Sequence, residues 1–147
     1  MVISNRYKYM IFYELKAHYT RQTGEDNPAL AKETYLVEGL NCSDVEQRLL
    51  AVIEPFIAAG DCEVPSCKKV QYYDIIPCPD GQYWYKARVE LIDIDNDKEV
   101  RKAVSILVEA DNMHEALGTL KKHLAALDCE VISLTKSPIM DVLRANL

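Results

Sequence analysis

Apolar and polar residues alternate most clearly in the second half of the chain, between residues 83 and 91. A period of two predicts a strand with one buried face. Residues 100–109 predict a second strand, reached through a turn at Asp95-Asn96-Asp97. Asn112 followed by Glu115 is typical of a helix start, and residues 129–135 predict a third strand. The predicted helix has one apolar face, formed by Met113, Ala116, Leu117, Leu120, Leu124 and Leu127.

The first half follows the same plan. Residues 10–19 and 32–38 predict two strands separated by a polar loop. Ser43 and Glu46 form a capping box for a helix, and Pro55 predicts a kink or a stop about twelve residues later because proline lacks a backbone donor.

Short segments of the first half recur in the second half in the same order. Asp61-Cys62-Glu63-Val64 returns as Asp128-Cys129-Glu130-Val131, an offset of 67. Leu36-Val37-Glu38 returns as Leu107-Val108-Glu109 at offset 71, and Lys16-Ala17 returns as Lys86-Ala87 at offset 70. The drop in offset predicts about four extra residues near the end of the first helix, ending at Gly60.

These patterns predict an α+β fold built from two ββαβ repeats, residues 1–76 and residues 77–147. A half of this size buries little surface alone, so we expect the repeats to pack as one pseudo-twofold unit. Its sheet would be mainly antiparallel, with two main helices, and Cys78-Pro79-Asp80-Gly81 would form a short joint.

Charge and hydropathy narrow the classes of function. The chain has 147 residues, with 17 basic and 23 acidic side chains and a net charge of −6, and each half carries −3. An acidic chain without a basic block is a poor ligand for nucleic acid or anionic membranes. The sequence shows no apolar run long enough for a bilayer span and no signal peptide, so we expect a cytoplasmic protein.

The five cysteines are an odd number without a secretory signal, which favours free thiols over disulfides. Cys62 and Cys129 occupy matching repeat positions, each followed by valine, which suits core thiols. A metal site and a reactive thiol remain alternatives, although no closely spaced cysteine pair is present.

The sequence offers no recognisable catalytic constellation. His18, His114 and His123 lack a partner at a fixed spacing, which favours solvated or structural roles. Glycine-rich phosphate loops, a nucleophile elbow and zinc-protease spacing are all missing from the sequence. We therefore predict no catalytic residue, no metal and no cofactor, and an enzyme is the less favoured class.

Four polar pairs recur at matching positions in the two halves. Lys16 with Lys86 and Lys69 with Lys136 are candidate ligands for an anion such as a nucleotide, held between the repeats. The matched acids would repel such an anion, so an ion pair or a cap within each half is the favoured role for them. These acids are Glu38 with Glu109 and Asp74 with Asp141.

Trp84, Lys86 and Arg88 share one face of the predicted strand and form a possible interaction face. An exposed ring beside cations suits single-stranded nucleic acid, whereas an ordinary amphipathic strand explains the same pattern. Tyr83 and Tyr85 point to the other side, toward the expected core.

The chain resembles a family known as a domain of unknown function, common in Bacteroidetes genomes and their phages. The likeness covers about residues 10–143 and rests on Tyr35-Leu36-Val37-Glu38, Pro55-Phe56-Ile57, Trp84-Tyr85-Lys86-Ala87 and Ile139-Met140-Asp141-Val142. The resemblance implies a small cytoplasmic protein that is phage-associated, acting in the host cytoplasm if phage-encoded. It implies no activity.

From these observations we expect a non-enzymatic binding or adaptor protein that acts by protein–protein contact, with another protein or a second copy as its partner. Two alternatives stay open. One is a module that binds or sequesters an anionic ligand between the repeats, and the other is binding of single-stranded nucleic acid.

Overall fold

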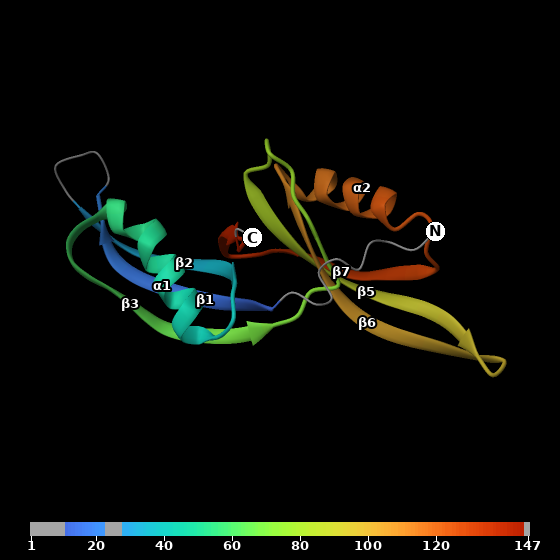
Figure 1. The fold of residues 1–147 in the computed structure, drawn as a ribbon. Helices are drawn as coiled ribbons and strands as arrows, with labels where there is room; N and C mark the ends of the chain where they lie inside the picture. The colour runs from blue at the N-terminus through green and yellow to red at the C-terminus, as the bar shows by residue number, and fades with distance from the viewer. Residues whose placement is uncertain (1–10, 23–27, 146–147) are drawn as a thin grey trace. The chain divides into compact units, whose positions relative to one another are not determined.

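The computed structural model describes residues 11–22 and 28–145, and these divide into two compact units (Figure 1). The β1–β2 unit comprises residues 11–70 and 138–145. Among the described residues, the β5–β6 unit comprises residues 71–137.

The β1–β2 unit is a four-stranded sheet with one helix (Figure 1). The strand order is β3-β1-β2-β8, in which β8 runs parallel to β2 and the other neighbours are antiparallel. Val45, Leu49 and Ile53 of the helix pack on one face of the sheet, against Leu15 and Val37. The elements are β1 (Phe12–Arg21), β2 (Ala29–Glu38), α1 (Cys42–Ile53), the 3₁₀-helix η1 (Glu54–Phe56), β3 (Ile57–Val70) and β8 (Ile139–Leu143).

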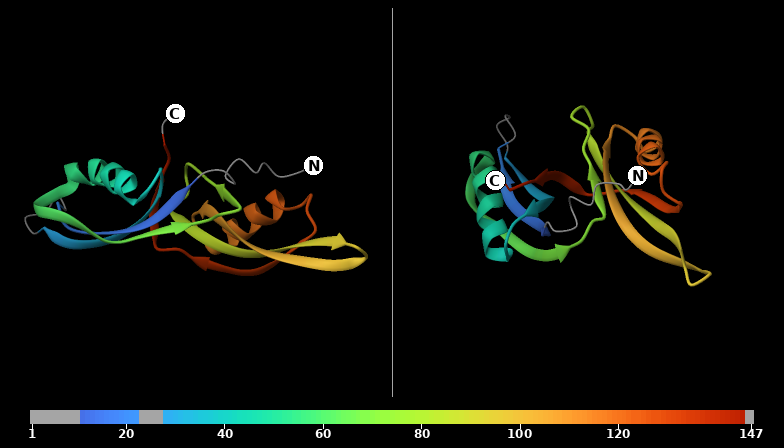
Figure 2. Two further views of the ribbon diagram at one scale, coloured as in Figure 1. Left: turned by 60° about the horizontal axis from the view of Figure 1, so that its bottom comes forward. Right: turned by 45° about the vertical axis from the view of Figure 1, so that its right-hand side comes forward.

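The β5–β6 unit has the same plan (Figure 2). Its strand order is β4-β6-β5-β7, in which β4 runs parallel to β6. Ala116 and Leu120 of the helix pack against Tyr85, Val89 and Val108 of the sheet. The elements are β4 (Asp74–Ile76), β5 (Tyr83–Asp95), β6 (Lys98–Ala110), α2 (Met113–His123) and β7 (Cys129–Lys136).

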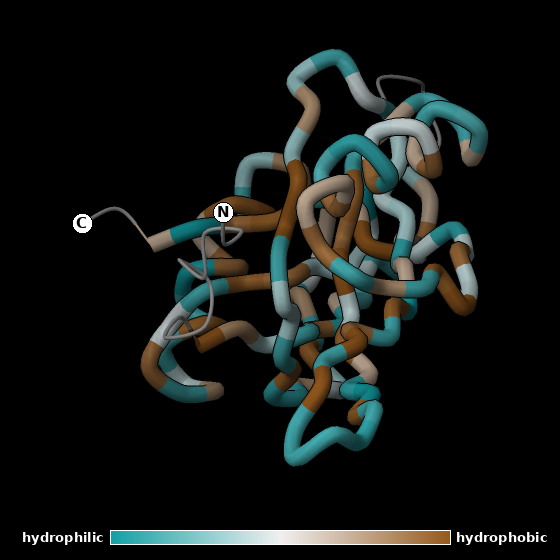
Figure 3. Tube along the Cα trace, turned by 90° about the vertical axis from the view of Figure 1, so that its right-hand side faces the viewer, coloured by the Kyte–Doolittle hydropathy of each residue, from teal (hydrophilic) through white to brown (hydrophobic). Residues whose placement is uncertain are grey.

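The α+β class predicted from the sequence is confirmed, with two sheets and two main helices. Figure 3 shows hydrophobic and hydrophilic positions alternating along much of the trace, as expected for strands with one buried face. The structure adds a fourth strand to each predicted half, namely β4 and β8. Each of these short strands pairs with the central hairpin formed by the other predicted half.

Helix boundaries follow local chemistry. Asn112 caps α2 as predicted, through a hydrogen bond from the Glu115 N–H to Asn112 Oδ1 at 2.9 Å. The capping box predicted at Ser43 is wrong, because Asn41 caps α1 and accepts from the Asp44 N–H at 2.8 Å. The stop predicted at Pro55 is confirmed, since α1 ends at Ile53 and proline lies in the 3₁₀-helix that follows.

The extra residues of the first half lie beyond the helix. Residues 54–56 form η1, and β3 is 14 residues long against eight in β7. The β1–β3 register shifts between Lys16 and His18 and again before Thr20, and Gly60 adopts a φ of 72°. Bulges in a longer edge strand therefore absorb the insertion. Within the described residues, no helix has the length and apolar character needed to cross a membrane.

Candidate interaction site

The hairpin of β5 and β6 continues past the strands that flank it (Figures 1 and 2). Its two strands pair along their whole length, from Tyr83 with Ala110 to Asp95 with Lys98. β7 pairs with β5 only as far as Leu91, and β4 pairs with β6 only from residues 106 to 108. The remainder, residues 92–101, is a two-stranded ribbon that we call the hairpin extension.

The turn at the end of the extension suits its sequence. Asn96 and Asp97 have φ angles of 51° and 60°, which are the left-handed values that a two-residue hairpin turn requires. Asparagine and aspartate tolerate these angles better than other residues with side chains. The turn predicted at residues 95–97 is therefore confirmed, and its geometry fixes the register of both strands.

The two faces of the extension differ in charge. Lys98, Val100 and Lys102 lie on the face that α2 covers further along the sheet, as the register with Leu91 and Asp93 shows. Val100 is 47% exposed. Asp95, directly opposite Lys98 on β5, and Asp93 share this face, although neither lysine forms an ion pair among the described residues.

Ile94 and Arg101 lie on the opposite face, where Ile94 is 72% exposed. The Arg101 guanidinium contacts Glu130 Oε2 at 2.8 Å, Glu99 Oε1 at 3.2 Å and Glu90 Oε2 at 3.5 Å. The hydrogen bond to Glu130 and the neighbouring glutamates raise the pKa of Arg101. Arg101 thus links β6 to β5 and β7 by ion pairs, and the three glutamates compensate its positive charge.

Beside this face, residues 98–104 of β6 form an edge that no described strand covers, whereas β4 pairs with residues 106–108 of the same edge. Ser105 O accepts a hydrogen bond from the Tyr73 N–H at 2.8 Å, so the backbone groups of Ser105 point away from β5. Because these directions alternate along a strand, the N–H and C=O of Glu99, Arg101 and Ala103 point the same way. Residues 98–104 pair with β5 alone among the described strands.

A cavity of about 280 Å³ lies where this edge meets the segment leading into β4. Its lining joins residues 102–105 of β6 to Gln71, Tyr72 and Tyr73. The lining is partly polar and partly aromatic, and it includes Lys102 at the end of the uncovered edge. The cavity and the edge therefore form one continuous candidate site.

The lysines singled out in the sequence do not share a face within either unit. Lys16 pairs with Ser66, whereas Lys69 pairs with Tyr13, which lies an odd number of residues from Lys16 on β1. Paired residues of antiparallel strands project to the same side and successive residues to opposite sides, so Lys16 and Lys69 lie on opposite faces of their sheet.

The same holds in the other unit, where Lys86 pairs with Thr135 and Lys136 with Tyr85. All four lysines are exposed. Lys136 Nζ lies 3.6 Å from the centroid of the Tyr83 ring, a cation–π contact.

The possible interaction face on β5 is also different from the prediction. Lys86 and Arg88 are exposed, but Trp84 is only 5% exposed, so the exposed ring needed for base stacking is absent at this position. Tyr85 lies in the core below α2 as predicted, whereas Tyr83 is 39% exposed instead of buried.

The matched acids hold backbone groups in both units. Glu109 Oε1 accepts from the Cys78 N–H, and Glu38 Oε1 accepts from the Ala145 N–H, each at 2.9 Å. These two glutamates therefore fasten the segments that follow β4 and β8. Glu109 does so within its predicted half, as favoured for the matched acids, whereas Glu38 bonds to a residue of the other predicted half.

The matched aspartates lie within the same two strands, Asp74 as the first residue of β4 and Asp141 as the third residue of β8, and each accepts from the N–H of the residue that follows it. Asp74 Oδ1 accepts from the Ile75 N–H at 2.9 Å, and Asp141 Oδ1 accepts from the Val142 N–H at 2.8 Å. Asp74 is 4% exposed and also contacts His123 Nε2 at 2.6 Å. His123 thus has an acidic partner 49 residues away in sequence, which a search for fixed spacings could not find.

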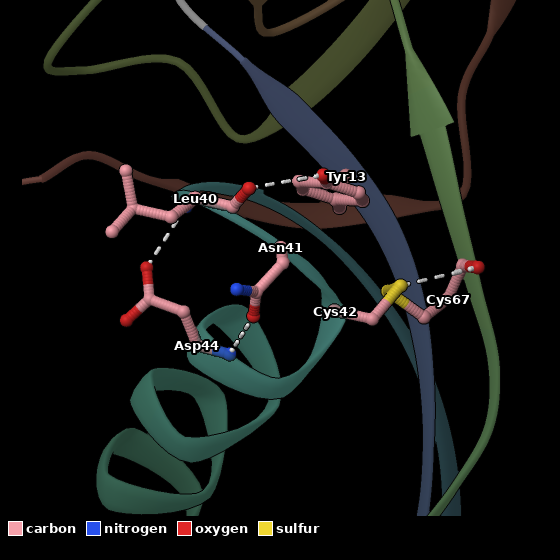
Figure 4. The surroundings of a disulfide bond; sticks show 6 residues. All are labelled: Tyr13, Leu40, Asn41, Cys42, Asp44 and Cys67. Atoms are coloured by element: carbon pink, nitrogen blue, oxygen red, sulfur yellow. Dashed lines mark hydrogen bonds between the residues drawn. A yellow bond between two sulfur atoms is a disulfide. The ribbon is translucent and has the colours of Figure 1, made fainter.

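The expectation of five free thiols is wrong for two of them. Cys42, the first residue of α1, forms a disulfide with Cys67 of β3, as Figure 4 shows. Their Cα atoms are 6.1 Å apart, within the range that a disulfide spans. Cys62, Cys78 and Cys129 are free and half-buried.

Burial raises the pKa of Cys62 and of Cys129, as expected for thiols at the margin of a core. In the part of the chain that the structure describes, no three His, Cys, Asp or Glu side chains gather closely enough to hold a metal ion.

A partly buried polar cluster lies between β1 and β2. The hydroxyls of Tyr19 and Tyr35 both donate to Glu33 Oε1, at 2.7 and 2.9 Å. Arg21 Nη1 donates to Tyr19 Oη at 2.6 Å and to Glu33 Oε2 at 3.1 Å, and its guanidinium stacks on Phe56. Burial, reinforced by Glu33, raises the pKa of both tyrosines. The cluster was not predicted, although tyrosine and charged residues two apart on neighbouring strands are a usable signal.

Comparison with known proteins identifies a family. Residues 11–145 match the domain of unknown function DUF4494, so the chain belongs to this family over nearly its whole length. The predicted resemblance to a domain of unknown function is thereby confirmed. No curated protein matches the sequence.

Proposed function

We propose that this member of the DUF4494 family is a non-catalytic binding protein that acts in the cytoplasm through contact with another protein. The observation that carries the proposal is the hairpin extension, residues 92–101, which exposes Ile94 on one face and Val100 on the other. The internal duplication expected from the sequence fits this proposal. If both units once had the same role, the β5–β6 unit could gain the hairpin extension while the β1–β2 unit kept the original form.

The extension is longer than the fold requires. A two-stranded ribbon is marginally stable in water, and ordering its residues costs conformational entropy that burial in a core would normally offset. Here the flanking strands stop before the extension, so its apolar side chains gain little burial within the chain. A partner that covers Ile94 or Val100 would supply that burial.

The two alternatives have less support. An anionic ligand needs convergent cations, and within each unit the matched lysines lie on opposite faces of the sheet. Single-stranded nucleic acid needs an exposed ring, and Trp84 is buried. The phage association belongs to the proposal as well, and a gene position among phage genes would support it.

Site-specific photocrosslinking in the native cell tests the proposal. A photoreactive phenylalanine analogue at position 94 should give one discrete adduct, whereas the same analogue at Ile132, an exposed apolar residue of β7, should not. A shortened hairpin, in which Asn-Gly replaces residues 92–101 and joins Leu91 to its partner Lys102, should lose the partner and keep the fold, because the backbone groups of Leu91 and Lys102 face each other as a two-residue turn requires. Equal crosslinking at positions 94 and 132 would contradict the proposal.

A further inference from the structure

We infer that the uncovered edge of β6, at residues 99–103, binds an extended acidic peptide of a partner protein by strand addition. The peptide would continue the line of β4 beside β6. This inference rests on the proposed function and specifies the partner's chemistry.

The backbone supplies the recognition. Glu99, Arg101 and Ala103 direct their N–H and C=O groups away from β5, and no described strand pairs with them. Main-chain hydrogen bonds of this kind provide the affinity when an extended peptide joins a sheet edge. The Tyr73 N–H already makes the first such bond, to Ser105 O, so the edge accepts a strand at the adjoining position.

The course of the chain leaves room for a peptide. β4 runs parallel to β6 from residues 74 to 76, and the segment before it lines a cavity of about 280 Å³ together with residues 102–105. A peptide that runs parallel to β6 would end at this cavity. Tyr72 and Tyr73 would then contact the side chain at its last paired position.

Side chains beside the edge select the charge of the peptide. Lys98 and Lys102 flank exposed Val100 on one face of β6, directly beside the positions where an added strand would place every second side chain. Asp93 and Asp95 share this face but lie on β5, one strand further from the added peptide. On the other face Glu99 and Glu90 surround Arg101, so acidic side chains are disfavoured there. The partner is therefore a segment in which acidic and uncharged residues alternate.

Lysines on an edge also keep sheets apart. They repel other cationic edges and so prevent unspecific pairing between chains. The same charges make an acidic strand the favoured exception, because opposite charges across adjacent strands attract. The arrangement therefore favours a partner peptide over a second copy of this chain at the same edge.

The test uses the full chain and two short fluorescent peptides, one with alternating Thr and Glu and one with alternating Thr and Lys. We expect fluorescence anisotropy to show tighter binding of the acidic peptide. We also expect the amide resonances of Glu99, Arg101 and Ala103 to shift. Reversal of both charges by Lys98→Glu with Lys102→Glu should lower the affinity for the acidic peptide by about tenfold and raise the affinity for the lysine peptide.

A proline at position 103 isolates the backbone contribution. Ala103→Pro removes an outward N–H that β5 does not use, so it should abolish peptide binding while preserving the β5–β6 ladder. Ala103→Val is the matched control, because it keeps the N–H and should bind normally. Trp84 fluorescence verifies that each variant is folded.

Four results would overturn the inference, of which the first three concern the peptides and the edge itself. They are equal affinity for both peptides, unchanged binding by the Ala103→Pro variant, and concentration-dependent self-association through this edge in place of peptide binding. A gain in affinity on removal of residues 1–9 would also overturn it, by assigning the edge to the chain's own N-terminus. Photocrosslinking at position 94 that survives Ala103→Pro would leave the proposed function intact and reject only strand addition.

Discussion

Glu109 accepts a hydrogen bond from the backbone N–H of Cys78, 31 residues earlier in the chain, at 2.9 Å. The contact folds the segment after β4 back onto the end of β6. Gly81 belongs to the same turn, since its N–H donates to Cys78 O at 2.9 Å and a Cβ at this position would lie 2.8 Å from Glu109 Cγ. Glu38 makes the corresponding bond to Ala145 in the other unit. The carboxylates predicted as structural caps therefore anchor the two short parallel strands.

Removal of this anchor should destabilise the β5–β6 unit. We expect Glu109→Ala to lower the free energy of unfolding by about 1.5–3 kcal/mol, because it leaves the half-buried Cys78 N–H without its charged acceptor. Glu109→Gln keeps an acceptor oxygen and should cost less. Urea unfolding followed by the fluorescence of Trp84, the single tryptophan, measures both. Glu99→Ala, at an exposed ion pair, is the control and should change stability little.

Truncation of the chain after Ser137 should affect one unit selectively. The deletion removes β8, which pairs with residues 34–37 of β2, and it removes the N–H that Glu38 accepts. We expect faster amide hydrogen exchange in β2 and unchanged unfolding of the β5–β6 unit, as reported by Trp84. Truncation after Arg144 keeps β8 and should have a smaller effect. A loss of Trp84 burial in either variant would contradict this independence.

Strands with a clear alternation of apolar and polar residues could be predicted from the sequence, and so could the helices. β4 and β8 could not, because three and five residues are too short to show a period. The alternation on β5 placed Tyr85 in the core correctly but made Trp84 a surface residue. Alternation identifies which residues share a face, and it does not reveal whether the second face is covered too.

The candidate site shows the same limit in another form. The turn at residues 95–97 could be predicted from the sequence. The exposure of Ile94 and Val100 could not, because both residues are ordinary strand formers. Their exposure follows from where β7 and β4 stop, which depends on long-range pairing. The faces on which Lys16 and Lys69 lie were hidden for a related reason, since the β1–β3 register that places them on opposite faces is not stated by the sequence.

The disulfide between Cys42 and Cys67 should stabilise the β1–β2 unit in oxidising buffer. It closes a loop with a sequence separation of 25, which corresponds to about 3.5 kcal/mol of lost entropy in the unfolded chain. We expect dithiothreitol, or Cys42→Ser with Cys67→Ser, to lower the urea midpoint of this unit. Alkylation and mass spectrometry should then count three reactive thiols before reduction and five after it.

Cys62→Ser is the matched control for the disulfide, because Cys62 lies on the same strand and is free. It should leave the response to dithiothreitol intact. Five reactive thiols in the protein purified without reductant would show that the bond does not form in the cell, as a reducing cytoplasm favours.

Alkaline pH should destabilise the β1–β2 unit through Tyr19 and Tyr35. Burial and hydrogen bonds to Glu33 raise the pKa of both hydroxyls above their usual value of 10.0 in the folded protein. As pH rises past about 10, the unfolded chain releases its tyrosine protons while the folded chain retains them. The unfolded state then binds fewer protons, so the free energy of unfolding falls with increasing pH, and the stability present below pH 10 is lost. Urea unfolding at a series of alkaline pH values, followed by circular dichroism, measures this decline.

Two variants separate the cluster from other tyrosines. Tyr35→Phe keeps the buried ring and removes one titrating hydroxyl, so its free energy of unfolding should fall less steeply with pH. Tyr83→Phe, outside the cluster, should retain the full slope. A wild-type protein with constant stability across this range would contradict the role assigned to the cluster.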